Sequence, residues 1–581
     1  MVKRWIFPPE AAPRVERLAD ALRVSPVTAR LLVNRGFAEP AAAQNFLQPT
    51  LHDLSDPSDD PATREAAACL LEAVREGAHV TIYGDFDADG ICATAVLMRA
   101  LHFLDARADT YIPHRIEDGY GLSEEAVREL ADGGTDVLVT VDCGISAAPQ
   151  VALARELGMT VIVTDHHPPR DGIPAADHLL NPKLEGSRLG YEFLAGVGVA
   201  FKLVWAMGQQ LTGSERVSDE FKDLLMEALA LVGIGTVADV VPLVEENRVL
   251  VHFGLQTIAA ADRPGLRALL ETARVNPEYI SSDDIGFRVA PLLNAAGRMG
   301  DAASAVELLT THEPARAGEL ADHLRAENRR RRSVQSSTCR EALAMVEENP
   351  ALREGQCIVL HKPDWHQGIV GLVASRLAER YWRPAFVLTG DGGVATGSAR
   401  SIGGFPLYTA IERCADLLER FGGHEAAAGL SLAVGKVAEF ARRINAVAAE
   451  LAPEETPEPE LRVDGKFDLS MLSLDLMREL DRLGPFGKGN PSPLFAASGL
   501  RVVGNPRTVG RDGRHLSFMV RQGQTTMRTF APGKADWLDQ MRERRGETVS
   551  LAYEPSVNRW RGNVNVELRA EDLRWDADAC A

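Results

Sequence analysis

The sequence predicts an α/β protein of several domains: a parallel-sheet domain, a long connecting helix, a smaller α/β domain and a C-terminal β-barrel. Three observations carry this prediction. From residue 77, short apolar runs alternate with helical segments, the pattern of a parallel sheet covered by helices. Residues Pro314 to Glu348 form one long, charged, alanine-rich segment. After an acidic, proline-rich linker, short strand-like segments follow one another, as in a small barrel.

The composition is that of an ordinary globular protein with three or more domains, since 581 residues are 45% apolar and 25% charged. We find no signal-peptide pattern and no apolar run of about 18 residues, so we expect a cytoplasmic protein without membrane contact. Seven cysteines are an odd number and form no C-x-x-C pair, which argues against a disulfide framework or a zinc ribbon.

The net charge of −19 argues against a protein that binds nucleic acid with its whole surface. It leaves room for a local basic track, because charge effects are screened over about 10 Å. Two basic stretches exist. One is Arg329–Arg332, and the other runs from Arg501 to Lys534, where seven basic residues meet one acid.

Residues 1–76 are predicted to be an N-terminal helical extension without chemistry of its own. In the domain that follows, residues 77–312, three predicted strands end in acids or histidines. The strands are Val80–Tyr83, Val137–Val141 and Thr160–Val163. The groups that follow them are Asp85, Asp87 and Asp89, then Asp142, then Asp165, His166 and His167. Because parallel sheets place ligands at the carboxyl ends of their strands, we expect these groups to converge at one edge.

Two residues of the later helical part of this domain are also singled out. Asp239 lies in an apolar run, where a carboxylate needs a partner. Pro291 and Gly297 interrupt a helical pattern and are expected to leave Arg298 on a tight loop. The connecting helix, residues 313–350, carries the four arginines of the first basic stretch, for which a solvated helix face is the favoured interpretation.

The second α/β domain, residues 351–452, contains two glycine-rich stretches that we expect to be loops, 397–404 and 421–429. Many such loops are only hairpin turns. Here Ser398, Arg400 and His424 stand beside the glycines, so that backbone amides and cationic side chains could close on a phosphate.

A linker at residues 453–461 leads to a domain at 462–575 with five predicted strands and one helix, which suits an OB-type barrel. The second basic stretch lies here among aromatic residues, the combination that single-strand binders use. We assign Phe518 and Phe530 to the core. Trp560, on a polar hairpin tip, is expected to contact a ligand.

The strand-end groups together with Asp239 predict a site for two divalent metal ions. Alone, the stretch of three aspartates could be a polar turn. Carboxylates with one or two imidazoles from several loops instead favour hard ions such as Mn²⁺ or Mg²⁺, and no thiolate is placed for zinc. Paired ions clamp the attacking and leaving oxygens of a displacement at phosphorus. Asp142 is the best candidate for the bridging carboxylate.

Several motifs resemble a known family. Asp85-Phe-Asp-Ala-Asp-Gly, Val141-Asp-Cys-Gly and Asp165-His-His are similar to motifs of the DHH phosphoesterases, which are named after the last triplet, and the RecJ branch is the most similar. Further RecJ-like stretches are Ile112–Leu122, Gly235–Leu243, Asn294–Met299, Trp365–Gly371 and Gly422–His424. The resemblance runs from about 77 to 570 and implies the order DHH domain, helix, DHH-associated (DHHA1-like) domain and OB fold, without the further C-terminal domain of some members.

The resemblance implies a bacterial, single-stranded-DNA-specific 5′-to-3′ exonuclease that releases mononucleotides in recombination and repair. It implies that His167 contacts the scissile phosphate and that Asp165 orients its neighbours, while Asp89 supports the turn. The implied metal ligands are Asp85, Asp87, Asp142, His166 and Asp239. For the substrate we choose Arg115, Ser398 and Arg400 at the 5′-phosphate, Arg298 and His424 on nearby phosphates, Trp560 in the barrel, and Tyr120 on a base or packed within its own turn.

The partners that the resemblance implies are single-stranded DNA with a 5′ end, a single-strand-binding protein and a helicase, and we expect a monomer. Two other functions are weighed. Related proteins hydrolyse pyrophosphate, short oligonucleotides or cyclic dinucleotides, but they lack the barrel. Others are replication-scaffold components that have lost metal ligands, whereas this chain shows no departure at a metal position.

Overall fold

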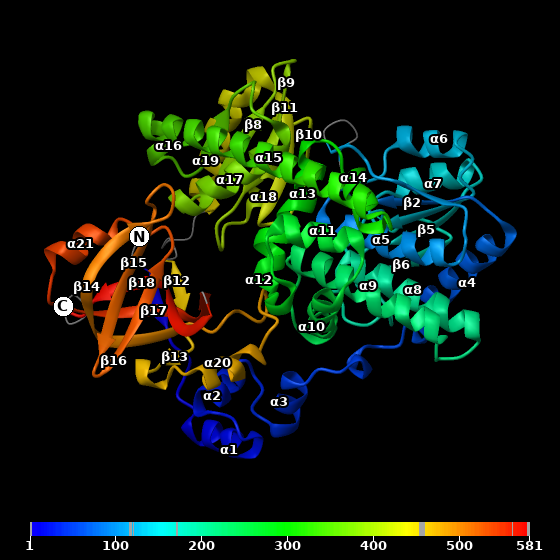
Figure 1. Ribbon diagram of the computed structural model, residues 1–581. Coiled ribbons are helices and arrows are strands. Elements are labelled where there is room, and N and C mark those ends of the chain that lie inside the picture. Colours follow the sequence, from blue (N-terminus) through cyan, green and yellow to red (C-terminus); the bar gives the residue numbers. More distant parts are fainter. Residues whose placement is uncertain are drawn as a thin grey trace. The chain divides into compact units, whose positions relative to one another are not determined.

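The computed structural model describes residues 3–115, 119, 121–169, 172–451, 459–560 and 562–577, without the side chain of Trp560. Two compact units make up the chain. Unit 1 combines Met1–Leu54, Pro242–His252 and Glu458–Ala581, and unit 2 combines Ser55–Val241 and Phe253–Pro457. The confirmed fold class is mixed α/β, with a parallel-sheet domain, a second α/β domain and a closed barrel (Figure 1).

The first sheet of unit 2 has the order β3-β2-β4-β5-β6, and all its neighbours are parallel. Its strands are β2 (Val80–Gly84), β3 (Ala108–Tyr111), β4 (Val137–Val141), β5 (Thr160–Thr164) and β6 (His178–Leu180). The chain adds β3 on one side of β2 and then returns to add β4 on the other side. The topological switch point therefore lies between β2 and β4, where parallel sheets bind their ligands.

Helices on this sheet bury its central strands completely. They are α4 (Pro61–Glu76), α5 (Ala88–Phe103), α6 (Glu124–Asp132), α7 (Ala148–Glu156) and α8 (Gly196–Thr212), and α9 (Asp219–Ala238) packs on α5 and α8. Both α8 and α9 pack against α5, which explains why α5 is buried on nearly every side. The chain continues with α10 (Glu245–Ala260), which spans the boundary between the two units, and then with α11 (Pro264–Ala273), α12 (Ser282–Asp284) and α14 (Ala303–Thr310) of unit 2.

The expected tight loop around Arg298 is wrong. Arg298 lies within a continuous helix, α13 (Ala290–Met299), which follows a π-helical turn, η4 (Ile285–Val289). Pro291 stands in the first turn of α13, where no backbone N–H is required. Gly297 serves close packing: a Cβ there would lie 2.1 Å from the carbonyl oxygen of Phe86.

The long helix α15 (Pro314–Glu348) precedes α16 (Pro350–Glu354) and the second sheet of unit 2. Three arginines of its basic stretch are exposed, and Arg331 is half-buried and hydrogen-bonded to Asn328 and Gln335. The second sheet has the order β10-β11-β9-β8-β7. Its elements are β7 (Ile358–His361), α17 (Gln367–Tyr381), β8 (Ala385–Thr389), β9 (Val394–Arg400), α18 (Leu407–Glu412), β10 (Arg420–Gly423), β11 (Ala427–Ala433) and α19 (Val437–Leu451).

The two glycine-rich stretches, expected to be loops, are largely strands of this sheet. Ser398 and Arg400 lie on β9, and β11 pairs with β9 so that Gly429 faces Ser398. The glycines permit close approach rather than a turn. A Cβ on Gly397 would lie 2.1 Å from the carbonyl oxygen of Val387 on the neighbouring strand.

Unit 1 contains a closed five-stranded barrel with the order β14-β15-β16-β18-β17, in which β17 pairs again with β14. Its strands are β14 (Phe495–Val509), β15 (His515–Gln522), β16 (Thr525–Ala531), β17 (Thr548–Trp560) and β18 (Asn563–Trp575), with α21 (Trp537–Glu543) before β17. The predicted core position of Phe518 is confirmed, whereas Phe530 is only half-buried. The short elements before the barrel are β13 (Gly465–Lys466) and α20 (Leu474–Asp481).

The expected N-terminal extension is not one piece. Helices α1 (Ala12–Leu22), α2 (Pro26–Asn34) and α3 (Pro40–Leu47) share one hydrophobic core with the barrel. The first strand, β1 (Arg4–Ile6), pairs in parallel with β12 (Glu460–Arg462). In contrast, α4 packs on β6 and α8 in unit 2. The division follows the apolar faces, because each helix is amphipathic and buries its stripe on the nearest core.

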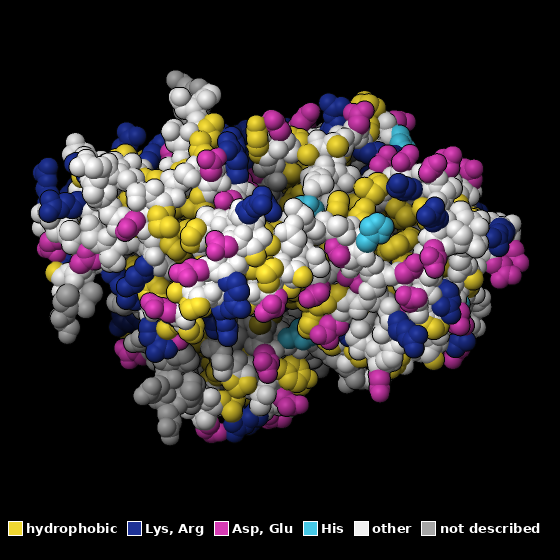
Figure 2. All heavy atoms as spheres, turned by 90° about the horizontal axis from the view of Figure 1, so that it is seen from below, with side chains coloured by type: hydrophobic (Ala, Val, Ile, Leu, Met, Phe, Trp, Pro, Cys, Tyr) yellow, Lys and Arg dark blue, Asp and Glu magenta, His cyan; other side chains and the backbone are white. Residues whose placement is uncertain are grey.

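The surface mixes charges of both signs. On the face drawn in Figure 2, basic and acidic side chains are interspersed, so the net charge of −19 does not produce a uniformly acidic surface there. Among the described helices, none has the length and apolar character needed to cross a membrane.

Candidate metal centre

The loop after β2 places the first two aspartates at the sheet edge. The carboxylate of Asp87 caps α5 by accepting from the N–H groups of Asp89 (2.9 Å) and Gly90 (3.2 Å). Asp85 is 4% exposed, and its Oδ1 accepts from the N–H of Phe86 at 2.7 Å. Asn294 of α13 accepts from the N–H of Ala88 at 2.9 Å and so holds the loop from the other side.

Asp142 follows β4 on the opposite side of the switch point. Its backbone is left-handed, with φ of 62°, a conformation that aspartate tolerates better than most residues. Its side chain is almost completely buried against the start of α8. A Cβ on Gly196 would lie 2.5 Å from Asp142 Oδ1, so glycine is needed there for α8 to come this close.

The third loop follows β5 and contains the Asp-His-His triplet. Asp165 accepts from the N–H of Ile145 (2.9 Å) and from Nδ1 of His167 (2.8 Å). Burial would raise the pKa of Asp165, but the bonds from His167 lower it below the usual value. Burial likewise opposes the charged form of His167, yet Asp165 raises the pKa of that histidine above its usual value.

Two residues after β6 hold this loop in place, and the sequence analysis did not identify them. Asn181 is buried and donates from Nδ2 to the carbonyl oxygen of His167 at 2.8 Å. The ammonium group of Lys183 donates to the carbonyl oxygen of His166. They could have been predicted from their position, because both directly follow a short strand that ends at the same sheet edge.

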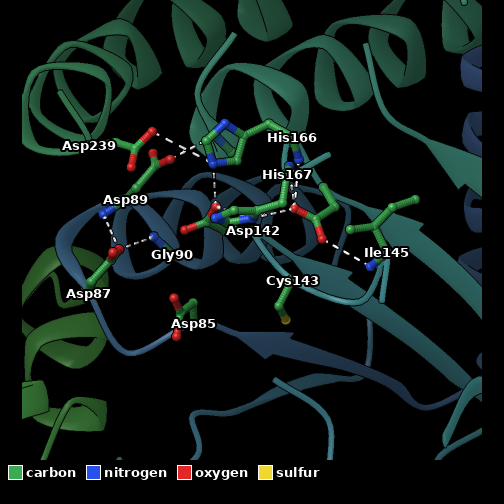
Figure 3. A network of polar contacts seen from close by, with 12 residues as sticks. Asp85, Asp87, Asp89, Gly90, Asp142, Cys143, Ile145, His166, His167 and Asp239 are labelled. Carbon is green, nitrogen blue, oxygen red and sulfur yellow. Dashed lines mark hydrogen bonds and ion pairs between the residues drawn. The ribbon is translucent and has the colours of Figure 1, made fainter. Parts of the chain in front are cut away.

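The three loops and the end of α9 bring the acids together (Figure 3). Asp239 is the C-cap residue of α9, and its Oδ2 lies 3.6 Å from Nε2 of His166. Three groups have ligand atoms within 4.8 Å of one another: Asp85 with Asp87 and Asp142, Asp142 with His166 and His167, and Asp89 with His166 and Asp239. The predicted convergence is thus present.

Asp89 has a larger part than the turn support that the sequence suggested. It does cap a helix, because its carboxylate accepts from the N–H groups of Gly196 (2.7 Å) and Val197 (3.1 Å) at the start of α8. The same carboxylate stands beside His166 and Asp239 and is therefore also a candidate ligand. The start of α8 brings these N–H groups to Asp89. Nothing in the sequence of the aspartate stretch predicts that contact.

The electrostatics of the cluster fit cations. Burial first, and then the neighbouring aspartates, raise the pKa of Asp142 well above its usual value. Burial and His167 lower the pKa of His166 to about 3, so this imidazole is neutral at pH 7. Its Nε2 faces Asp142 Oδ1 at 3.1 Å, and neither atom has a hydrogen-bond partner among the described residues. An imidazole nitrogen and a carboxylate oxygen that are buried side by side without hydrogen-bond partners are ligand atoms that a divalent ion can satisfy.

A cavity of about 1190 Å³ in unit 2 opens beside the cluster. Asp87, Asp165 and His167 line one part of it. Four of the residues predicted to bind substrate line it too: Arg115, Ser398, Arg400 and His424. The sheet of the second α/β domain therefore contributes a polar and basic wall that faces the acidic strand ends.

Arg115 and Arg400 of this wall, together with Arg298 behind it, are half-buried near one another. Burial, Arg115 and Arg331 lower the pKa of Arg298 to about 9. Burial and Arg115 also lower the pKa of Arg400. The guanidinium of Arg115 stacks on the Phe86 ring at 4.7 Å, which fixes it at the mouth of the acidic loop. These half-buried like charges are the counterpart of the acidic cluster and form a site for an anion.

Two predicted substrate residues lie outside the described parts of the chain. Tyr120 itself is among the residues that are not described, and Trp560 has no described side chain. Arg298 does not line the cavity, but its Nη1 donates to the carbonyl oxygen of Gly368, which does, at 3.3 Å.

Comparisons with known proteins agree with this architecture. Family models match in the expected order: the DHH family N-terminal domain at residues 79–234, the DHHA1 domain at 354–450 and the RecJ OB domain at 463–572. The single-stranded-DNA-specific exonuclease RecJ of Bacillus subtilis is 35% identical over 98% of this chain and 70% of its own length. Its namesake from Escherichia coli is 38% identical over 88% of this chain and 89% of its own length.

A solved structure of RecJ from Thermus thermophilus in complex with Mn²⁺ superposes with a TM-score of 0.81. It covers 98% of this chain and 79% of its own, at 33% identity. A second structure of that protein contains Mg²⁺. With relatives this similar over nearly its whole length, the chain belongs to the RecJ family.

Proposed function

We propose that this chain is a metal-dependent exonuclease that hydrolyses single-stranded DNA from its 5′ end and releases mononucleotides. The observation that carries the proposal is the cavity, in which a largely buried acidic cluster and a half-buried basic wall stand side by side. The first suits divalent cations and the second a terminal phosphate. Curated relatives that bear the name single-stranded-DNA-specific exonuclease support the choice of substrate.

Two ions, Mn²⁺ or Mg²⁺, fit the cluster. We assign Asp85 and Asp87 to one ion, His166 and Asp239 to the other, and Asp142 to both, because Asp142 stands between these two pairs. Asp89 is a further candidate for the second pair. When bound, the ions supply a nucleophile at neutral pH and neutralise charge on the phosphate.

We assign His167 to contact with the scissile phosphate. Its Nδ1 donates to Asp165, so its Nε2 is left to face the cavity that the residue lines. The raised pKa of His167 favours its protonated form relative to a free histidine, and in that form Nε2 can donate to a phosphate oxygen. Asp165 keeps the ring in this orientation and itself accepts from the backbone of the neighbouring loop.

The basic wall accounts for the proposed polarity. Arg115, Ser398 and Arg400 supply the hydrogen bonds for a terminal 5′-phosphate, with Arg298 and His424 beside them. A strand held by that phosphate presents its first internucleotide phosphate to the acidic cluster. Because the distance between the 5′-phosphate site and the acidic cluster is fixed, each cleavage releases one nucleotide.

The basic surface of the barrel is evidence that the substrate is a polymer. The basic residues from Arg501 to Arg528 are exposed on it, and only one acid interrupts them. Such a surface tracks a phosphate backbone, and the activity should therefore fall as salt rises. On the same grounds we propose a role in DNA recombination and repair in the bacterial cytoplasm. A single-strand-binding protein, a helicase and the monomeric state stay predictions.

The test uses the full chain with Mn²⁺ and 5′-phosphorylated single strands that carry a label at either end. We expect labelled mononucleotide early from the 5′-labelled strand, a shortening ladder from the 3′-labelled strand, and no product with EDTA. Duplex DNA of the same sequence is the matched control and should stay intact. Release from the 3′ end contradicts the polarity, and hydrolysis of dinucleotides alone points to a small-molecule phosphodiesterase.

A further inference from the structure

We propose that Phe287 is a stacking platform for a base of the substrate strand on the 3′ side of the scissile phosphate. The proposal rests on the proposed function, because it needs a strand that enters the metal centre with its 5′ end held by the basic wall. Phe287 is 72% exposed, although burying a phenylalanine side chain is strongly favourable. An exposed aromatic face beside a nucleic-acid site is the group on which bases stack.

The helical turn that carries Phe287 is unusual. Residues Ile285–Val289 form a π-helix, in which the N–H of Ala290 bonds to the carbonyl oxygen of Ile285. Single π-turns inside helical runs occur frequently at functional sites. Here Pro291 provides the local cause, because it has no N–H to donate to the carbonyl oxygen of Phe287, four residues earlier. The widened turn rotates the side chains that precede α13.

The same helical run touches the metal centre further along. Asn294 accepts from the N–H of Ala88 in the acidic loop, and Gly297 packs against the carbonyl oxygen of Phe86. Four residues after Asn294 comes Arg298, in the basic cluster. On the other side, η4 adjoins the helix that ends in Asp239, since a Cβ on Gly286 would lie 3.9 Å from Val237 Cγ1.

We take the bound strand to run along this helical segment, from Arg298 past Asn294 towards Phe287. Arg298 stands at the phosphate end and Asn294 at the acidic loop, and Phe287 lies about two turns, or about 10 Å, before Asn294. Stacked nucleotides rise about 3.4 Å each, so Phe287 falls within about three nucleotides of the cleaved bond. A base stacked there holds the strand after each cleavage, while the next phosphate moves to the metals.

The test is a double-mutant cycle on the full chain, with single strands that carry an abasic residue at nucleotide 2, 3 or 4 from the 5′ end. In the wild type we expect one of these positions to lower kcat/KM about tenfold, the scale of one base–aromatic stack. In Phe287→Ala the intact and the abasic strand should be cleaved equally slowly. Phe287→Trp should restore the preference for the intact strand.

The control is Leu211→Ala, which removes another exposed apolar side chain, near the far end of α8, and should leave kcat/KM unchanged. Thermal unfolding of each variant checks the fold. If Phe287→Ala slows all strands alike and the abasic penalty persists, or if the variant has no effect, the platform is wrong while the proposed function stands. A wild type that leaves single strands intact overturns both.

Discussion

The acidic sheet edge and the basic wall of the cavity differ in how the chain assembles them. The acids come from loops after β2, β4 and β5, so the parallel topology alone brings them together. The basic groups come from the loop after β3, from α13 and from β9, which only tertiary packing makes neighbours. Both clusters hold like charges beside one another, the acids buried and the arginines half-buried, and a ligand of the opposite sign would relieve the repulsion in each.

The difference has an energetic consequence. Repulsion within a buried cluster destabilises the folded protein until its ligand binds, and the ligand then contributes stability by mass action. We expect cations to govern the stability of the acidic edge. We expect phosphate to change the stability of the basic wall only. The following substitutions separate the contribution of the acidic edge from that of the basic wall.

The largest effect is expected for Asp142→Asn. The variant loses the shared carboxylate, so cleavage should fall to background while binding of single strands persists. Because burial and repulsion raise the pKa of Asp142, the metal-free variant should unfold at a higher temperature than the metal-free wild type. Differential scanning calorimetry with and without Mn²⁺ measures this, and an undiminished rise in Tm with Mn²⁺ would show that Asp142 is not a shared ligand.

A smaller effect is expected for Asn181→Ala, which removes the support of the His167 carbonyl without touching a proposed ligand. Loss of such supporting bonds typically costs about tenfold to a hundredfold in activity or metal affinity. The measurement is kcat as a function of Mn²⁺ concentration. Asn349→Ala removes an exposed helix cap elsewhere and is the control for stability. Equal kcat in the two variants argues against a positioning role for Asn181.

The smallest effect on turnover, and the most selective, is expected for Arg400→Gln. Loss of one charge-assisted hydrogen bond should reduce the preference for 5′-phosphorylated over 5′-hydroxyl strands roughly tenfold. Arg413→Gln in the same domain is the control, since Arg413 forms an exposed ion pair with Glu450. Competition between the two strands measures the preference. An unchanged ratio in Arg400→Gln removes the arginine from the phosphate site.

The sequence predicted the structure correctly where the local pattern of residues and the topology of the sheet lead to the same answer. β4 has the predicted bounds, Val137–Val141, because a run of β-branched and leucine residues ends at an acid and a glycine. The positions of Asp142 and of the Asp-His-His triplet at one edge follow from the parallel order alone.

The sequence was insufficient where a residue serves a distant neighbour. Gly397 looked like a loop residue, yet it admits the carbonyl oxygen of a neighbouring strand. Gly297 looked like a helix breaker, yet it admits the acidic loop. Asp89 appeared to be surplus until Gly196 and α8 were seen to approach it. In each case the deciding contact is made by a part of the chain that no local pattern identifies.

The pairing of β1 with β12 also sets an order for biosynthesis. Residues Met1–Leu54 leave the ribosome long before their core partners, the barrel residues from Glu458 onward. At roughly 5–20 residues per second, the three N-terminal helices wait on the order of 20–80 s with their apolar faces uncovered. Unit 2 can complete its own core in that interval. These helices therefore complete their core only after unit 2 has been synthesised, and their apolar faces could bind a chaperone in that interval.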